Sequence, residues 1–477
     1  MKSDSLMKHL HLICTLLFGV AVFLFFGLAY PHHLHYQEQY QLFLFDSTYV
    51  WEIVSLPGGI SDLLGRFCTQ FFLFAWVGAF IIALLLSAVQ LLTFRLINVQ
   101  WSYGLTFVPS FLLWLFMLDE NALMSGIWAI LLTLLVACVI VRQTTGWTRR
   151  ALLIVAIPIL YLLVGPVCFP IPIDSLWHGI HYYRYPTIFP WLLWAASLSV
   201  FALWIMGMVL RRTKQQSRAL YDTISKGNWI IGTIPVILVA IVMGSLIWKN
   251  SNFKAEKVMQ YDFMACHQQW NRILETINVE KPNNQIGVTV QNLALAMHGV
   301  LLEHMSEYNQ NGIAGLLPDV KEDATSPLPT AEAFYQLGMV NVAQRTVFEA
   351  QEAILDFQKS GRCYKRLAQT NLINGQYEVA RKYLSALQKT LFYRDWANET
   401  LPLLGNEKAI ANHPEYGHLR QYAYDADFYF GDHVTPEMLE SLYFHNTDNR
   451  LAYQYLLAYY LLTGDRERFN HFISEKR

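Results

Sequence analysis

Acidic side chains occur in two separate polar segments that interrupt an otherwise apolar N-terminal half. Glu38, Asp46 and Glu52 lie in the first segment, and Asp119 and Glu120 lie in a much shorter second one. Neighbouring carboxylates can act as general bases or bind a divalent cation such as Mg²⁺ or Mn²⁺. We therefore predict Glu38, Asp46, Asp119 and Glu120 as catalytic residues, with Asp46, Asp119 and Glu120 also holding the metal. The simpler alternative is that Asp119 and Glu120 are charged caps of a membrane helix.

Basic and histidine side chains in the same kind of segment could bind a phosphate. Arg66 follows the first acidic group, and a third polar segment runs from 170 to 188. Guanidinium and imidazolium groups form charge-assisted hydrogen bonds to phosphate oxygens. The predicted substrate-binding residues are Arg66, His178, His181 and Arg184. The alternative for the third segment is anchoring, because its tryptophan and tyrosines are typical of a membrane interface.

Apolar runs long enough to cross a membrane separate these segments. A helix advances about 1.5 Å per residue, so about twenty apolar residues span the hydrocarbon core. The chain is 54% hydrophobic and only 15% charged, and we predict about seven membrane helices. Their ranges are 10–29, 68–94, 102–118, 123–141, 151–170, 189–210 and 228–248. Residues 1–248 therefore form the predicted transmembrane domain, with outer loops 30–67, 119–122 and 170–188.

The basic residues predict the orientation, because Lys and Arg are retained on the cytoplasmic side. Arg95, Arg142 and the basic stretch 211–226 follow alternate runs, which places the N-terminus in the cytoplasm. An odd number of spans then places the C-terminal domain outside. In a Gram-negative bacterium this is an inner-membrane protein with a periplasmic domain. Lys and Arg number 35 against 36 Asp and Glu, which argues against nucleic acid as a partner.

Loop 30–67 is long for a connection between membrane helices, and long loops are often functional. Its apolar residues recur at helical spacing, which predicts two short amphipathic helices lying at the membrane interface. The turn Leu56-Pro57-Gly58-Gly59 joins them, because Pro and Gly interrupt helices.

Residues 249–477 form the second predicted domain, an array of helical hairpins. Phe334 and Ala350 recur at an interval of thirty residues as Tyr364 and Ala380. This pattern is typical of tetratricopeptide repeats, whose paired antiparallel helices bind proteins or peptides. The alternative is a plain helical lid on the membrane half. The predicted fold class is therefore all-α, a bundle of about seven membrane helices followed by a helical-repeat domain.

Two cysteines, Cys266 and Cys363, fall in the second domain. An extracytoplasmic location would permit a disulfide between them. Two free thiols are the favoured alternative.

The first half resembles the GT-C superfamily of membrane glycosyltransferases, which use lipid-linked sugar donors. The stretch from Asp46 to Leu64 is similar to an Asp, Pro-Pro-Gly, Leu-Leu-Gly pattern in the first outer loop of some relatives. Leu56-Pro57 stands here where those relatives have Pro-Pro. The resemblance implies an N-in core of seven helices, a catalytic acid in the first outer loop and further acids between the third and fourth helices. A periplasmic C-terminal domain follows.

The chain also resembles multi-pass membrane proteins of Bacteroides-type bacteria that carry a periplasmic tetratricopeptide-like domain. The stretches Asn341–Ala353 and Ser360–Leu367 carry this likeness, which brings no assigned activity.

Two functions of different classes follow from these patterns. The first is a glycosyl or oligosaccharyl transferase that takes a polyprenyl-phosphate-linked glycan from the bilayer and an acceptor protein or peptide from the periplasm. The alternative is a non-enzymatic inner-membrane scaffold whose repeat domain recruits envelope proteins. Transport is a weaker third hypothesis, because no predicted span carries the buried charge pair that marks an ion path.

Overall fold

The computed structural model describes residues 2–97, 100–143, 146, 190–216, 229–319, 326–354, 358–424 and 435–475. Every regular element in these ranges is a helix. The chain divides into two compact units. The first unit contains Met1–Glu38 and Asp46–Phe253, and the second contains Gln39–Phe45 and Lys254–Arg477.

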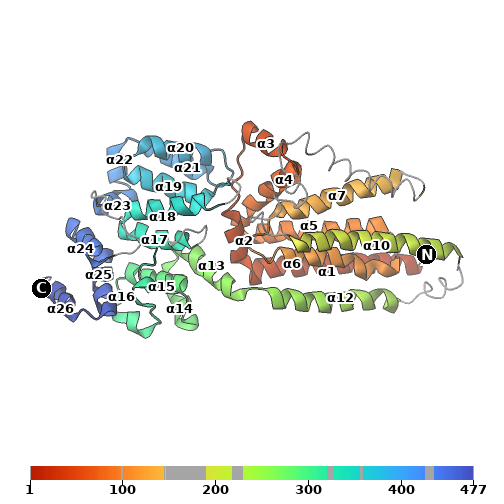
Figure 1. The fold of residues 1–477 in the computed structure, drawn as a ribbon, viewed down its shortest axis with the longest axis horizontal. Coiled ribbons are helices and arrows are strands. Elements are labelled where there is room, and N and C mark those ends of the chain that lie inside the picture. Colours follow the sequence, from red (N-terminus) through yellow and green to blue (C-terminus); the bar gives the residue numbers. More distant parts are fainter. Residues whose placement is uncertain are drawn as a thin grey trace. The chain divides into compact units, whose positions relative to one another are not determined.

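Long apolar helices that pack side by side form the first unit (Figure 1). α5 lies centrally, because α1, α6 and α7 all pack against it. Aromatic rings fill much of the interior, for example Phe18 with Phe111 and Phe25 with Trp114. The elements are α1 (Lys2–Leu24), η1 (Phe25–Ala29), α2 (Pro31–Glu38), α3 (Ser47–Val54), α4 (Gly59–Thr69), η2 (Gln70–Leu73), α5 (Ala75–Ile97), η3 (Gln100–Phe107), α6 (Val108–Phe116), α7 (Met124–Gln143), α10 (Trp191–Gln216) and α12 (Trp229–Asn250).

Four helical stretches in the described ranges are long and apolar enough to cross a membrane. They are Leu10–Ala29, Ala75–Ile97, Met124–Gln143 and Trp191–Val209. A fifth arises if Ile234–Asn250 and Phe253–Cys266, which meet at a bend of 57°, form one span. The predicted span 151–170 lies outside the described residues.

Two predicted spans differ from the observed elements. The run expected from residue 68 instead completes α4 and the 3-10 helix η2 before α5 begins at Ala75. The run 102–118 is split into the 3-10 helix η3 and the short α6, which has Pro109 in its first turn. Proline lacks the N–H that an α-helix interior needs and disfavours α-helical backbone in the residue before it. An apolar run therefore does not by itself predict one continuous helix.

The two short helices predicted in the first outer loop are present as α3 and α4. Gly58 ends the turn between them with φ of 73°, a left-handed conformation that glycine adopts without steric cost. α4 packs along α7, while Trp51 of α3 and Ile60 of α4 are exposed. The loop therefore forms a helical pair with apolar side chains on its outer surface.

The second unit is an assembly of short helices, in which α17 packs on α18, α18 on α19 and α19 on α20. Ala350, Leu367, Ala368 and Ala380 are buried where these helices meet. The elements are α13 (Phe253–Cys266), α14 (Trp270–Glu280), α15 (Gln285–Met297), α16 (Leu301–His304), η5 (Met305–Glu307), η6 (Gly312–Gly315), α17 (Pro327–Leu337), α18 (Val340–Glu352), α19 (Gly361–Ile373), α20 (Tyr377–Leu387), α21 (Arg394–Thr400), η7 (Leu401–Leu403), α22 (Glu407–Ala411), α23 (Tyr416–Tyr422), α24 (Pro436–His445), α25 (Arg450–Thr463) and α26 (Arg466–Glu475).

The division into units differs from the predicted domains in two places. The predicted boundary between residues 248 and 249 lies inside α12, and the chain divides after Phe253. Residues 39–45 belong to the second unit, although loop 30–67 was assigned to the transmembrane domain. The physical reason is that Leu42 N–H donates to the Lys359 carbonyl and Phe45 N–H to the Lys389 carbonyl.

Candidate functional site

A buried ion pair lies in α4, within loop 30–67. Arg66 donates from Nε and Nη2 to Oδ2 of Asp62, at 3.1 and 2.8 Å. The two residues are four apart on one helix, so their side chains lie on the same face. Only 3% of the Asp62 side chain and 12% of the Arg66 side chain are exposed. The other carboxylate oxygen of Asp62, Oδ1, is buried and has no hydrogen-bond donor among the described residues.

Tyr49 of α3 completes this cluster by a side-chain hydrogen bond with Arg66. Burial raises the pKa of the Tyr49 phenol, and the Arg66 charge opposes that rise. Burial also disfavours the charge on Arg66, but Asp62 and Tyr49 outweigh it and raise the guanidinium pKa. We call Tyr49, Asp62 and Arg66 the loop cluster. It holds a permanent positive charge next to a buried carboxylate oxygen.

Helix α2, at the start of loop 30–67, contacts residues 117–122. His33 Nε2 lies 3.0 Å from the Met117 carbonyl, and Gln37 Nε2 donates at 3.3 Å to the carbonyls of Asp119 and Ala122. Because a carbonyl can only accept, His33 carries its proton on Nε2. Burial lowers the pKa of His33 to about 4, although the Met117 carbonyl and the Asp119 charge act in the opposite direction. His33 is therefore neutral at pH 7.

The predicted catalytic acids do not form a shared cluster. Glu38 is buried at the end of α2, and Asp46 caps α3, where its Oδ1 accepts from Thr48 N–H. Asp119 Oδ1 accepts from the backbone and side-chain nitrogens of Asn121, at 2.9 and 3.1 Å. Glu120 is half-buried in the same turn.

The predicted metal site of Asp46, Asp119 and Glu120 is not formed. No group of three or more His, Cys, Asp or Glu side chains in the described ranges is arranged to hold a metal ion. The physical reason is local, because backbone N–H groups at the start of α3 and in the 119–121 turn already bind two of these carboxylates. The two loops do approach each other as predicted, but through His33 and Gln37.

Of the predicted substrate-binding residues, Arg66 lies in the loop cluster. His178, His181 and Arg184 lie outside the described residues. Asp62 and Tyr49 were missed by sequence reasoning. A signal for Asp62 was available, since it stands four residues before Arg66 on a predicted amphipathic helix, where i and i+4 residues are neighbours.

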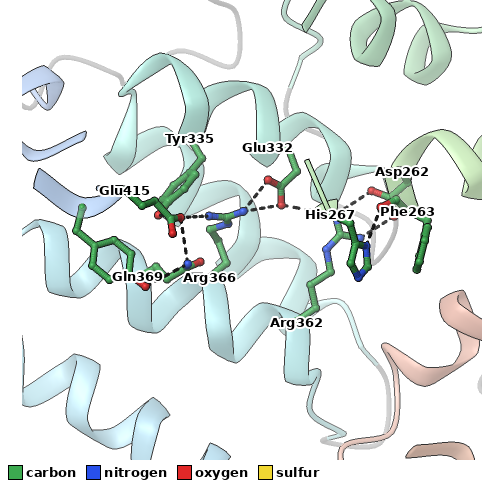
Figure 2. A network of polar contacts seen from close by, with 10 residues as sticks. Asp262, Phe263, His267, Glu332, Tyr335, Arg362, Arg366, Gln369 and Glu415 are labelled. Atoms are coloured by element: carbon green, nitrogen blue, oxygen red, sulfur yellow. Dashed lines mark hydrogen bonds and ion pairs between the residues drawn. The ribbon is translucent and has the colours of Figure 1, made fainter. Parts of the chain in front are cut away.

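A second polar network lies inside the second unit (Figure 2). Arg362 of α19 donates from two nitrogens to Asp262 of α13, at 2.6 and 2.9 Å. One turn further along α19, Arg366 Nη2 donates to both oxygens of Glu332 of α17. The Arg366 guanidinium lies 3.6 Å from the centroid of the Tyr335 ring.

This unit-2 network extends to the segment before α23. Glu415 Oε1 accepts from the Tyr335 hydroxyl at 2.8 Å and from Gln369 Nε2 at 3.2 Å. Burial raises the pKa of Tyr335, and the Arg366 charge opposes the rise. Two guanidinium groups, Arg362 and Arg366, face the three carboxylates of Asp262, Glu332 and Glu415. Ion pairs and hydrogen bonds therefore connect α13, α17, α19 and the residue before α23. The network acts as an internal clamp.

The two cysteines of the second unit, Cys266 and Cys363, are free thiols, as the favoured alternative predicted. Burial raises the pKa of Cys363 to about 11, so the reactive thiolate is scarce at pH 7.

In the part of the chain that the structure describes, the protein is all-helical, and several of its apolar helices are long enough to cross a membrane. The chain belongs to a family of unknown function, DUF6057, which matches residues 7–477. No curated protein matches the chain, and no solved structure does.

Proposed function

We propose that this chain is a membrane transferase of the GT-C type, which moves a glycosyl or oligosaccharyl group from a polyprenyl-phosphate-linked donor to an acceptor. The observation that carries the proposal is the loop cluster, a buried Asp62–Arg66 pair on a short helix whose outer surface is apolar. A lipid-linked donor presents an apolar chain and a phosphate together. The apolar surface of α4 could contact the lipid chain, and Arg66 could bind the phosphate.

The reaction needs one proton acceptor and one cation. In this proposal Asp62, whose Oδ1 receives no hydrogen bond from the described residues, accepts the proton of the acceptor hydroxyl, and Glu38 is the second candidate. The acceptor oxygen bonds to the anomeric carbon, the bond from that carbon to the phosphate oxygen breaks, and polyprenyl phosphate leaves. Arg66 stabilises the charge that develops on the phosphate. No step passes through Mg²⁺ or Mn²⁺, because the described carboxylates do not fit one.

We place the protein in a bacterial inner membrane, with its N-terminus in the cytoplasm and its second unit in the periplasm. Support comes from Arg95 and Arg142, which lie in the last turns of α5 and α7. The positive-inside rule favours the cytoplasmic side for both arginines, and so for these ends of α5 and α7.

Transfer of a polyprenyl-linked glycan by membrane vesicles tests the proposal. Asp62→Asn and Arg66→Gln should each lower transfer by about a hundredfold or more. Ser55→Ala, an exposed position at the end of α3, should transfer at the wild-type rate. Thermal unfolding of each variant separates lost chemistry from lost fold. Wild-type rates in folded Asp62→Asn and Arg66→Gln variants would overturn the proposal.

The second candidate function is a membrane-anchored scaffold, favoured by the stacked hairpins α17–α18 and α19–α20. Such arrays present extended surfaces for protein or peptide partners. A deletion strain separates the two functions. A folded Asp62→Asn chain that restores the wild-type phenotype supports the scaffold, whereas failure to restore it supports the transferase.

A further inference from the structure

Residues 39–45 connect α2 to α3, and we call this segment the strap. Leu42 N–H donates to the Lys359 carbonyl at 2.9 Å, and Phe45 N–H donates to the Lys389 carbonyl at 2.7 Å. Tyr40, Leu42 and Phe43 are buried, whereas Phe45 is exposed. The strap is therefore a packed part of the second unit, although the segments on both sides of it belong to the first.

The strap lies across one end of the hairpin α19–α20. Lys359 precedes Ser360, whose side chain caps α19 by accepting from Cys363 N–H. Lys389 follows the last turn of α20. The two acceptor carbonyls thus come from the start of one helix and the end of its partner. A change in the packing of this hairpin displaces both acceptors.

The strap also joins two of the predicted acids directly. Glu38 is the residue before it and Asp46 is the residue after it. Phe45, whose N–H is bound to the Lys389 carbonyl, is joined to Asp46 by a peptide bond. A displacement of a few ångströms at Lys389 therefore moves the backbone at Asp46.

We infer that the strap is a coupling element, through which the packing of α19–α20 controls the backbone that carries Glu38 and Asp46. Its role in activity rests on the proposed transferase function, whereas the conformational coupling does not. The partner in this inference is the acceptor protein or peptide, which would bind the second unit and alter the packing of α19 against α20.

Paired substitutions at Phe45 and Leu42 test the coupling in the full-length chain. Phe45→Pro removes the N–H donor, while Phe45→Ala removes the same ring and keeps the donor. Leu42→Pro and Leu42→Ala form the second pair. Phe45 is exposed whereas Leu42 is buried, so Phe45→Pro disturbs packing less than Leu42→Pro does.

Amide hydrogen exchange of the detergent-solubilised protein is the measurement. Each proline variant should raise exchange of the remaining strap amides by roughly tenfold, about the factor that one net hydrogen bond contributes. Exchange should also rise at the Thr48 amide, which Asp46 caps. The alanine variants should match the wild type at Thr48.

Two results would overturn the inference. One is rapid exchange of the Leu42 and Phe45 amides in the wild type, which would show that the strap is not held. The other is the same Thr48 exchange rate in Phe45→Pro and Phe45→Ala. Glycan transfer is measured in parallel, and a wild-type chain that transfers nothing would count against the proposed function while the exchange data still decide the coupling.

Discussion

Arg66 binds only one of the two carboxylate oxygens of Asp62, since both of its donating nitrogens contact Oδ2. Oδ1 is buried and receives no donor from the described residues. A salt bridge that serves stability alone would be expected to satisfy both oxygens, because an unsatisfied buried acceptor costs about 1–3 kcal/mol. One oxygen of this buried pair is therefore left without a hydrogen-bond donor from the described residues.

The geometry at Arg66 predicts different kinetics for two substitutions. Arg66→Lys keeps the positive charge but replaces the planar guanidinium with a single ammonium. We expect a KM for the lipid-linked donor raised about tenfold or more, with kcat less affected. Arg66→Gln should lower kcat as well, because no charge remains to stabilise the leaving phosphate. Steady-state kinetics in vesicles measure both, and equal effects of the two variants would contradict the assignment.

Breaking the unit-2 network should destabilise the protein strongly. Arg362→Met leaves the Asp262 carboxylate with no guanidinium in a setting where only 14% of its side chain is exposed. Removing one partner of a buried pair typically costs about 3–5 kcal/mol. The control is Arg381→Met, because Arg381 pairs with Glu378 at the surface, where an ion pair contributes about 0–1 kcal/mol.

Chemical unfolding of the purified protein measures both free energies. The double variant Asp262→Leu with Arg362→Met should recover part of the loss, since no unpaired charge is then buried. A loss from Arg362→Met no larger than that from Arg381→Met would show that the network does not act as a clamp.

The lowered pKa of His33 predicts that the folded protein loses stability on acidification. Its pKa is about 4 in the folded protein and about 6.5 when unfolded. Between these values the unfolded chain binds more protons, so the free energy of unfolding falls as the pH drops from 6.5 towards 4. The full effect is roughly 3 kcal/mol. His33→Gln should remove this part of the pH dependence, and unfolding midpoints between pH 4 and 7 compare the two proteins.

Replacing Gly65 by a larger residue should disturb the packing of α4 against α7. A Cβ at this position would lie 2.5 Å from Ser125 N, inside the contact between α4 and α7. Backbone atoms cannot rotate away, so Gly65→Ala should separate the helices and lower the unfolding temperature. Gly244→Ala is the matched control, because a Cβ there meets nothing within 4 Å and alanine favours helix by about 1 kcal/mol. Equal unfolding temperatures for the two variants would contradict the close contact.

Much of the helical architecture was predictable from the sequence, whereas the contacts within the site were not. Hydropathy and the Pro-Gly-Gly turn predicted α3 and α4, because both signals are local. The same reasoning failed near residue 68 and at Pro109, where apolar composition continues while the backbone changes from one kind of helix to another. Hydropathy measures transfer to lipid and does not report where a helix breaks.

The candidate site shows the same limit. Acids in two loops suggested a shared metal, but Asp46 and Asp119 bind nearby backbone N–H groups. Side chains of this type readily satisfy turns and helix caps, and composition alone does not distinguish that role from catalysis. The pairing of Asp62 with Arg66 could have been predicted from their spacing of four residues. The contact of Tyr49 with Arg66 could not, because it depends on how α3 packs against α4.

The strap has a consequence for the order in which the protein folds. Its hydrogen-bond acceptors, Lys359 and Lys389, follow Leu42 and Phe45 by more than three hundred residues. Chains fold from the N-terminus during synthesis, so loop 30–67 leaves the ribosome long before its partners exist. The helices of the first unit can assemble early, but the backbone around Glu38 and Asp46 reaches its final conformation only after α20 has been made. Any activity that depends on these residues therefore begins only after Lys389 has been made.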